Sequence, residues 1–152
     1  MKIYFVRHGE SLDSANGLFQ RSDSGLSEIG IQQAHIIADE LKNVKFKIIY
    51  TSTLTRAMET ADIINKKLMT KVEVLQDLAE EKRPTIIEGK LKSLDENQKV
   101  IKEIETNYND LGWRHSDEDT FEIVKDRARR LANHVSNLKD DTYLLVSDYI
   151  SM

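Results

Sequence analysis

The amino-acid sequence predicts an α/β protein of three layers, in which helices cover both faces of a mainly parallel central sheet. Short apolar runs at residues 3–6, 46–50, 72–75 and 143–147 have the composition of strands. Between most of these runs lie segments whose apolar residues recur every three or four positions, as on one face of a helix. Strands that alternate with helices in this way form parallel sheets.

Composition limits the classes of protein that need to be considered. The 152 residues suit one domain, so we expect residues 1–152 to form a single domain. The net charge of −4 argues against nucleic-acid and membrane-surface partners. We expect a cytoplasmic protein, because no apolar run could span a membrane and the amino terminus does not resemble a signal peptide. The absence of cysteine removes disulfides, thiolate zinc sites and cysteine nucleophiles.

The first predicted strand, residues 3–6, has the composition of a buried strand and ends at Arg7, His8 and Gly9. Open α/β sheets bind their ligands at the carboxyl ends of their strands, which makes this end a candidate site. We expect Gly9 to provide either a positive φ or the close approach of a ligand to the backbone. A plain strand followed by a charged turn would explain any one of these residues.

Residues 11–26 are rich in Ser, Asp, Asn and Gly and predict a loop. Ser27 is a suitable N-cap for the helix that follows. The third predicted strand, at residues 72–75, is short. Residues 76–92 are irregular, and the charged pair Glu80 and Glu81 lies within them.

Two further helices are expected in the second half of the chain. Ser93 and Glu96 form a capping-box pattern before a helix that reaches about Tyr108. Ser116 and Asp119 indicate the start of another helix. Its apolar residues recur at alternating spacings of three and four, which predicts that they pack in the core: Phe121, Val124, Ala128, Leu131, Val135 and Leu138.

The second predicted strand and the helix that begins near Leu54 place Arg56 in a first helical turn. From there its guanidinium could face the same strand-end crevice as Arg7. Two such forked donors match the geometry and the charge of a phosphate group. An isolated arginine at this position would more often be an ordinary surface residue.

Three stretches resemble the histidine phosphatase superfamily, which includes the phosphoglycerate mutases. They are residues 7–11 (RHGES), residues 51–61 (TSTLTRAMETA) and residues 78–80 (LAE). The resemblance implies that His8 is the nucleophile that accepts a phosphoryl group. It implies further that Arg7 and Arg56 hold phosphate oxygens, that Ser14 replaces an asparagine that contacts phosphate in many members, and that Glu80 protonates the leaving oxygen, with Glu81 as the alternative.

The resemblance implies a phosphatase that acts on a phosphomonoester or a phosphohistidine, through a phosphohistidine intermediate at His8. Neither a metal ion nor another cofactor is required. The expected partners are phosphate, a phosphorylated small molecule or a phosphoprotein. A phosphotransferase of the phosphoglycerate mutase type is the alternative, but so short a chain leaves little room for the insertions that usually shape a mutase pocket.

The sequence departs from the family pattern at its carboxyl-terminal end. After residues 144–147 (LLVS) the family has a second histidine, whereas this chain has Asp148. A carboxylate repels phosphate, so we expect weak activity, or else a catalytically inactive phospho-ligand-binding or regulatory domain. The family's last strands are absent, which leaves a sheet edge that could pair with another chain in a homo-oligomer. A truncation, a shifted reading frame and a natural short variant all fit this ending.

Overall fold

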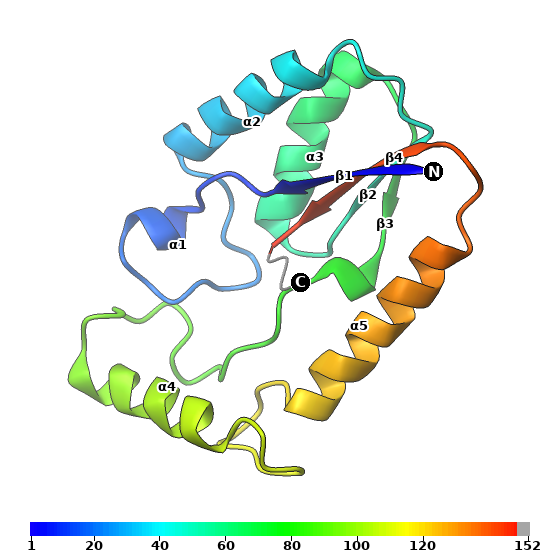
Figure 1. The fold of residues 1–152 in the computed structure, drawn as a ribbon. Coiled ribbons are helices and arrows are strands. Elements are labelled where there is room, and N and C mark those ends of the chain that lie inside the picture. Colours follow the sequence, from blue (N-terminus) through cyan, green and yellow to red (C-terminus); the bar gives the residue numbers. More distant parts are fainter. Residues whose placement is uncertain (149–152) are drawn as a thin grey trace.

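The computed structural model describes residues 1–148, which form an α/β fold around a parallel four-stranded sheet (Figure 1). The predicted fold class is therefore confirmed. The strand order is β1-β4-β2-β3, and every neighbouring pair is parallel. The strands are β1 (Lys2–Arg7), β2 (Ile48–Thr51), β3 (Val72–Val74) and β4 (Thr142–Ser147); the helices are α1 (Leu12–Ala15), α2 (Glu28–Leu41), α3 (Thr55–Leu68), the 3-10 turn η1 (Gln76–Leu78), α4 (Asp95–Asn107) and α5 (Phe121–Ser136).

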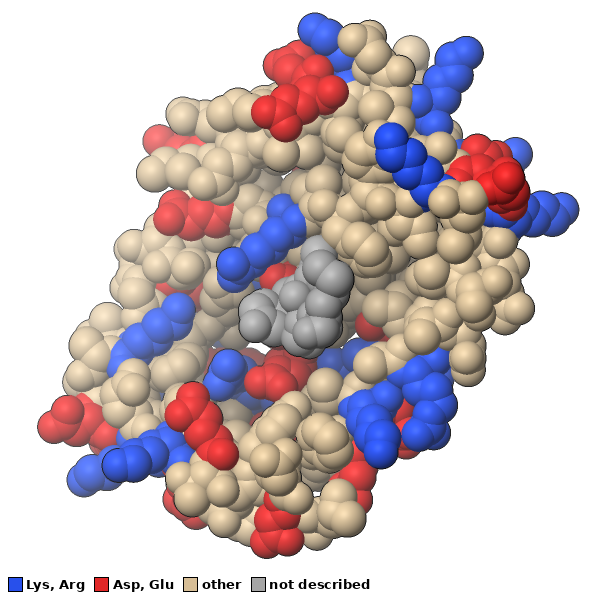
Figure 2. Space-filling view, in the orientation of Figure 1, with Lys and Arg blue, Asp and Glu red and all other residues tan. Residues whose placement is uncertain are grey.

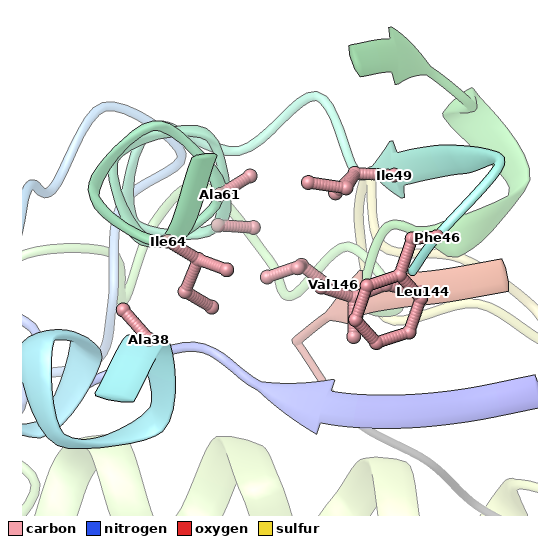
Figure 3. Packing of buried hydrophobic residues seen from close by; sticks show 8 residues of the cluster. Ala38, Phe46, Ile49, Ala61, Ile64, Leu144 and Val146 are labelled. Carbon is pink, nitrogen blue, oxygen red and sulfur yellow. The ribbon is translucent and has the colours of Figure 1, made fainter. Parts of the chain in front are cut away.

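The two faces of the sheet are covered by different helices, as Figure 1 shows. Along β4, Leu144 and Val146 pack into a cluster with α2 and α3, whose small residues Ala38 and Ala61 allow the helices to approach closely (Figure 3). The alternate residues, Tyr143 and Leu145, point to the opposite face, where the apolar side of α5 packs. This alternation makes β4 the centre of the three layers.

The apolar stripe of α5 is only partly in the core. Leu131, Val135 and Leu138 pack against the second cluster, as the sequence predicts. Val124 and Ala128 belong to neither core cluster and line an apolar groove of about 660 Å³, which Leu131 and Val135 also border, and no residue of α5 is fully buried. The prediction that all six stripe residues are core residues is therefore wrong for the first half of the helix.

The first strand is an edge strand, which corrects the expectation of a buried one. Its only neighbour among the described residues is β4, and the side chain of Phe5 remains 46% exposed. An apolar composition does not distinguish an edge strand from a central one, because both bury at least one face. Pairing of this edge with another chain stays a prediction.

Several predicted boundaries also move. The expected loop at 11–26 contains the short helix α1, which Ser11 caps. Helix α2 is capped by Ser27 as predicted, since the Ser27 hydroxyl accepts from the Gly30 amide at 3.0 Å. The predicted capping box at Ser93 does not form; α4 starts two residues later, behind Leu94. Helix α5 begins after Thr120, not at the earlier positions expected.

Gly9 does not have the positive φ that was one expectation, and packing alone already requires a glycine here. A Cβ at this position would collide with the backbone carbonyl of Gly30 at the start of α2. A Cβ at Gly30 would in turn collide with the carbonyl of Glu10. The end of β1 and the first turn of α2 are thus in direct backbone contact.

None of the helices within residues 1–148 is long and apolar enough to cross a membrane.

Candidate active site

Three adjacent parallel strands, β1, β4 and β2, end at the same edge of the sheet, and a polar residue follows each of them there. Arg7 at the end of β1 is in register with Ser147 of β4, and Thr51 of β2 is in register with Val146. The next residue along each strand is therefore His8, Asp148 or Ser52. All three are buried.

His8 is held as a neutral imidazole. Its Nδ1 lies 2.5 Å from the carbonyl oxygen of Gly9, and a carbonyl only accepts, so Nδ1 carries the proton. Its Nε2 accepts a hydrogen bond from Nε of Arg56 at 3.2 Å. Burial, together with the positive charges of Arg56 and Arg7, lowers the pKa of His8 to about 4. The ring is therefore neutral at pH 7, with an unprotonated Nε2.

Arg56, the second residue of α3, is almost wholly buried, and its guanidinium connects most of the site. Besides His8, it contacts the carboxylate of Glu80 through Nη2 at 3.1 Å and the carbonyl of Arg21 through Nη1 at 3.1 Å. Its own carbonyl accepts from the Thr60 hydroxyl at 2.7 Å, and that hydroxyl oxygen accepts from the Gly9 amide at 3.1 Å. Thr60 thereby joins the first turn of α3 to the end of β1.

Asp148 lies beside both of these residues and is only 1% exposed. Its Oδ1 is 3.0 Å from Nε of Arg56 and 3.8 Å from Nε2 of His8. Its Oδ2 accepts from the Ser52 hydroxyl at 2.6 Å. Burial raises the pKa of the Asp148 carboxyl, although Ser52 and Arg56 oppose the shift. The Nε–H of Arg56 points at His8, so Oδ1 accepts no hydrogen bond of good geometry within residues 1–148.

A cavity of about 690 Å³ opens above these groups, and Arg7, Ser14, Arg56 and Glu80 all line it. Figure 2 shows this face hollowed between the sheet and the α4–α5 region, with basic and acidic side chains around the opening. The side chain of Arg7 is exposed and makes no ion pair with any described residue. It is therefore available to an anion in the cavity.

The structure separates the two candidate acids. Glu80 contacts Arg56, whereas Glu81 lies near Arg83, at 3.7 Å, and near the hydroxyl of Tyr108, at 3.5 Å. Glu80 is thus the carboxyl that shares a guanidinium with His8. Within residues 1–148, no three His, Asp or Glu side chains are placed to hold a metal ion.

Some contributors to the site could not be recognised from the sequence. Thr60 belongs to the stretch 51–61 that resembles the family, but its hydrogen bond with the Gly9 amide joins residues that are far apart in the chain. Arg127, on α5, donates to the backbone of Glu80 at 3.0 Å. Nothing in the spacing of Arg127, one of several charged residues on a helix, distinguishes it from its neighbours.

The sequence model of the histidine phosphatase superfamily (branch 1) matches residues 3–150. The chain belongs to this superfamily. One curated relative is the probable phosphoglycerate mutase GpmB of Yersinia pestis. It is 45% identical to this chain over 65 residues, which cover 42% of this chain and 30% of the relative. The chain therefore matches less than a third of that relative's length.

Solved structures confirm that this histidine phosphatase superfamily member has the phosphoglycerate mutase-like fold. YhfR of Bacillus stearothermophilus superposes with a TM-score of 0.77 and 27% identity, over 95% of this chain and 72% of the other. A proposed alpha-ribazole-5'-P phosphatase from Escherichia coli superposes with a TM-score of 0.80 and 25% identity, over 97% and 73%. The phosphoglycerate mutase of Bacillus anthracis, at 23% identity and a TM-score of 0.73 over 95% and 73%, shows the same fold.

Proposed function

We propose that this chain is a phosphatase that hydrolyses a phosphomonoester or a phosphohistidine through a phosphohistidine intermediate at His8. The observation that carries the proposal is the state of the His8 ring. The carbonyl of Gly9 fixes its tautomer and leaves Nε2 unprotonated, with its lone pair accepting from Nε of Arg56. A histidine nucleophile requires a fixed tautomer with an unprotonated nitrogen, and the Arg56 Nε–H would turn to a phosphate oxygen as that nitrogen attacks.

Each step of the reaction has a candidate residue. A phosphoryl group would bind between Arg7 and Arg56, which would offset the charge on its oxygens. Nε2 of His8 would then attack phosphorus as the bond to the leaving oxygen breaks. Glu80, which has to be protonated in the substrate complex, would give its proton to that oxygen. Water would next attack phosphorus and pass a proton to the Glu80 carboxylate as the bond to Nε2 breaks and phosphate is released.

The presence of Asp148 favours slow turnover in the proposed reaction. Its carboxylate lies 3.0 Å from Nε of Arg56, so it competes with phosphate for the same charge. The same observation favours a second candidate function, a catalytically inactive domain that binds a phosphorylated ligand. A mutase-type transfer of the phosphoryl group to a second substrate has one support, the named activity of the Yersinia pestis relative.

The test is hydrolysis of 4-nitrophenyl phosphate by the wild-type chain and by His8→Ala, with an acid-quenched search for phosphohistidine. His35→Ala is the matched control, because His35 is exposed on α2. We expect turnover and the phosphohistidine to disappear in His8→Ala and to persist in His35→Ala. Equal turnover in His8→Ala and wild type would refute the mechanism. Vanadate binding that depends on Arg56, without any turnover, would establish the binding function instead.

A further inference from the structure

The proposed acid, Glu80, lies on a segment with no regular secondary structure. Residues 79–83 follow η1 and form neither helix nor strand, so no ladder of backbone hydrogen bonds fixes them. The position of Glu80 must therefore be set by contacts from elsewhere. Its carboxyl contacts Arg56 of α3, and the contacts to the backbone of the segment come from α5 and from the residues just before it.

Arg127 of α5 binds the backbone of this segment directly. Its Nη1 donates to the carbonyl of Ala79 at 3.1 Å and to the carbonyl of Glu80 at 3.0 Å. A planar guanidinium is well suited to this task, because its donors have a fixed geometry. The contact holds the residue whose side chain reaches Arg56.

Asp119 completes the arrangement on the other side of Glu80. Its carboxylate accepts from the Lys82 amide at 2.9 Å, and its own amide donates to the Lys82 carbonyl at 3.0 Å. The same carboxylate forms an ion pair with Nη2 of Arg127. We call this pair the Arg127–Asp119 clasp. The clasp hydrogen-bonds to the backbone of Ala79 and Glu80 through Arg127 and to the backbone of Lys82 through Asp119.

The clasp is mostly shielded from water. The side chains of Arg127 and Asp119 are 17% and 13% exposed. Ion pairs that are this sheltered keep a defined geometry better than exposed ones, which exchange freely with solvent. Arg127 reaches the edge of the cavity, but the hydrogen bonds described for its two terminal nitrogens go to the segment and to Asp119.

We propose that Arg127 is a positioning residue, which sets the Glu80 carboxyl against the leaving oxygen without touching the substrate. This inference rests on the proposed function. It predicts a loss that depends on the leaving group, because a basic alcohol needs a proton in order to leave and a nitrophenolate hardly does. The effect of Arg127 should therefore appear only where the effect of Glu80 appears.

The experiment compares Arg127→Gln with Arg129→Gln, an identical change on the same helix. Arg129 is exposed and pairs only with Asp126 of its own helix among the described residues. Rates are measured with phenyl phosphate and with 4-nitrophenyl phosphate, and vanadate inhibition reports on the phosphate pocket. We expect Arg127→Gln to lower kcat with phenyl phosphate by about tenfold to a hundredfold, a fraction of a general acid's usual contribution. The nitrophenyl rate, the vanadate inhibition constant and all values for Arg129→Gln should stay near wild type.

A second variant links the effect to the acid. Adding Arg127→Gln to Glu80→Gln should cause no further loss, since an acid that is absent cannot be misplaced. Equal losses on both substrates, weaker vanadate inhibition or full additivity with Glu80→Gln would each overturn the inference.

If the wild-type chain has no turnover, the proposed function fails and the inference is decided separately. Hydrogen exchange of the peptide that spans residues 79–83 then provides the measurement. Faster exchange in Arg127→Gln than in Arg129→Gln would support the clasp, and equal exchange in both would overturn it.

Discussion

Nε of Arg56 lies 3.0 Å from Oδ1 of Asp148, and both side chains are almost completely shielded from solvent. The Ser52 hydroxyl fixes the other carboxylate oxygen at 2.6 Å. The guanidinium proposed to receive phosphate is therefore already paired with a buried anion. A phosphoryl group that enters the cavity must bind beside that anion, and this relationship determines how the site should respond to substitution.

Replacing Asp148 with Asn should strengthen anion binding. The change keeps the shape and an oxygen for Ser52, but removes the charge that opposes phosphate. Two like charges about 5 Å apart repel by about 3 kcal/mol at an effective dielectric near 20. At about 1.4 kcal/mol per tenfold, we therefore expect vanadate to bind about a hundredfold more tightly, as measured by calorimetry or by inhibition of hydrolysis.

The advantage of Asp148→Asn should shrink as the pH falls, because burial raises the pKa of Asp148 and a protonated carboxyl no longer repels an anion. Asp39→Asn, at an exposed ion pair with Lys67, is the control and should leave vanadate affinity unchanged. Asp148→His should raise turnover as well as binding. An unaltered affinity in Asp148→Asn would mean that Asp148 does not oppose the anion.

His8 should make the folded chain less stable in mild acid. The pKa of His8 is about 4 in the folded state and 6.5 in the reference state. The folded chain keeps its full stability above pH 6.5, where His8 is neutral in both states, and loses part of it as the pH falls toward 4, because only the unfolded chain takes up the proton easily. Between pH 7 and pH 4.5 this loss is about 2.5 kcal/mol, at 1.36 kcal/mol per pKa unit. Urea unfolding of wild type and His8→Asn should show that wild type loses more stability over this range. His35→Asn, at an exposed site, should behave like wild type; parallel pH profiles for wild type and His8→Asn would contradict the assigned shift.

Gly9→Ala should be strongly destabilising, because the new methyl group would collide with the backbone of Gly30 and neither main chain can move independently. We expect a loss of about 3 kcal/mol in the free energy of unfolding, at the upper end for overpacking. Gly112→Ala is a useful comparison. Gly112 has a φ of +80° and open space around it, so its loss should reflect backbone conformation alone, at about 1 kcal/mol. A Gly9→Ala protein no less stable than Gly112→Ala would show that the contact is not tight.

The two halves of α5 should differ in their effect on stability. Leu131 and Val124 both border the apolar groove, but only Leu131 also packs against the second core cluster. Truncation of a packed leucine leaves a cavity, so Leu131→Ala should cost about 2–3 kcal/mol. Val124→Ala should cost about 1 kcal/mol or less, because its side chain is already partly open to solvent. Chemical denaturation measures both values, and equal losses would mean that the groove is filled in solution.

Much of the fold and part of the site could be predicted from short stretches of sequence. Helical and strand periodicities act over a few residues, so the α/β class and most element positions followed from them, with boundaries displaced by one to four residues. Caps were less predictable. The Ser93 capping box does not form although its pattern is present, since the helix begins at Asp95 with Leu94 at the N-cap position.

The sequence by itself determined that Arg7, His8 and Arg56 would meet, since parallel strands and the helices that follow them bring such residues to one edge of the sheet. Only the tertiary structure decided what surrounds them. The resemblance predicts that Asp148 opposes phosphate, but its pairing with Arg56 and its position beside His8 follow from the strand order, which places β4 between β1 and β2. The packing of α5 brings Arg127 to the backbone of Glu80. Both contacts join residues distant in the chain, and such contacts depend on the packing of whole layers, which no local pattern encodes.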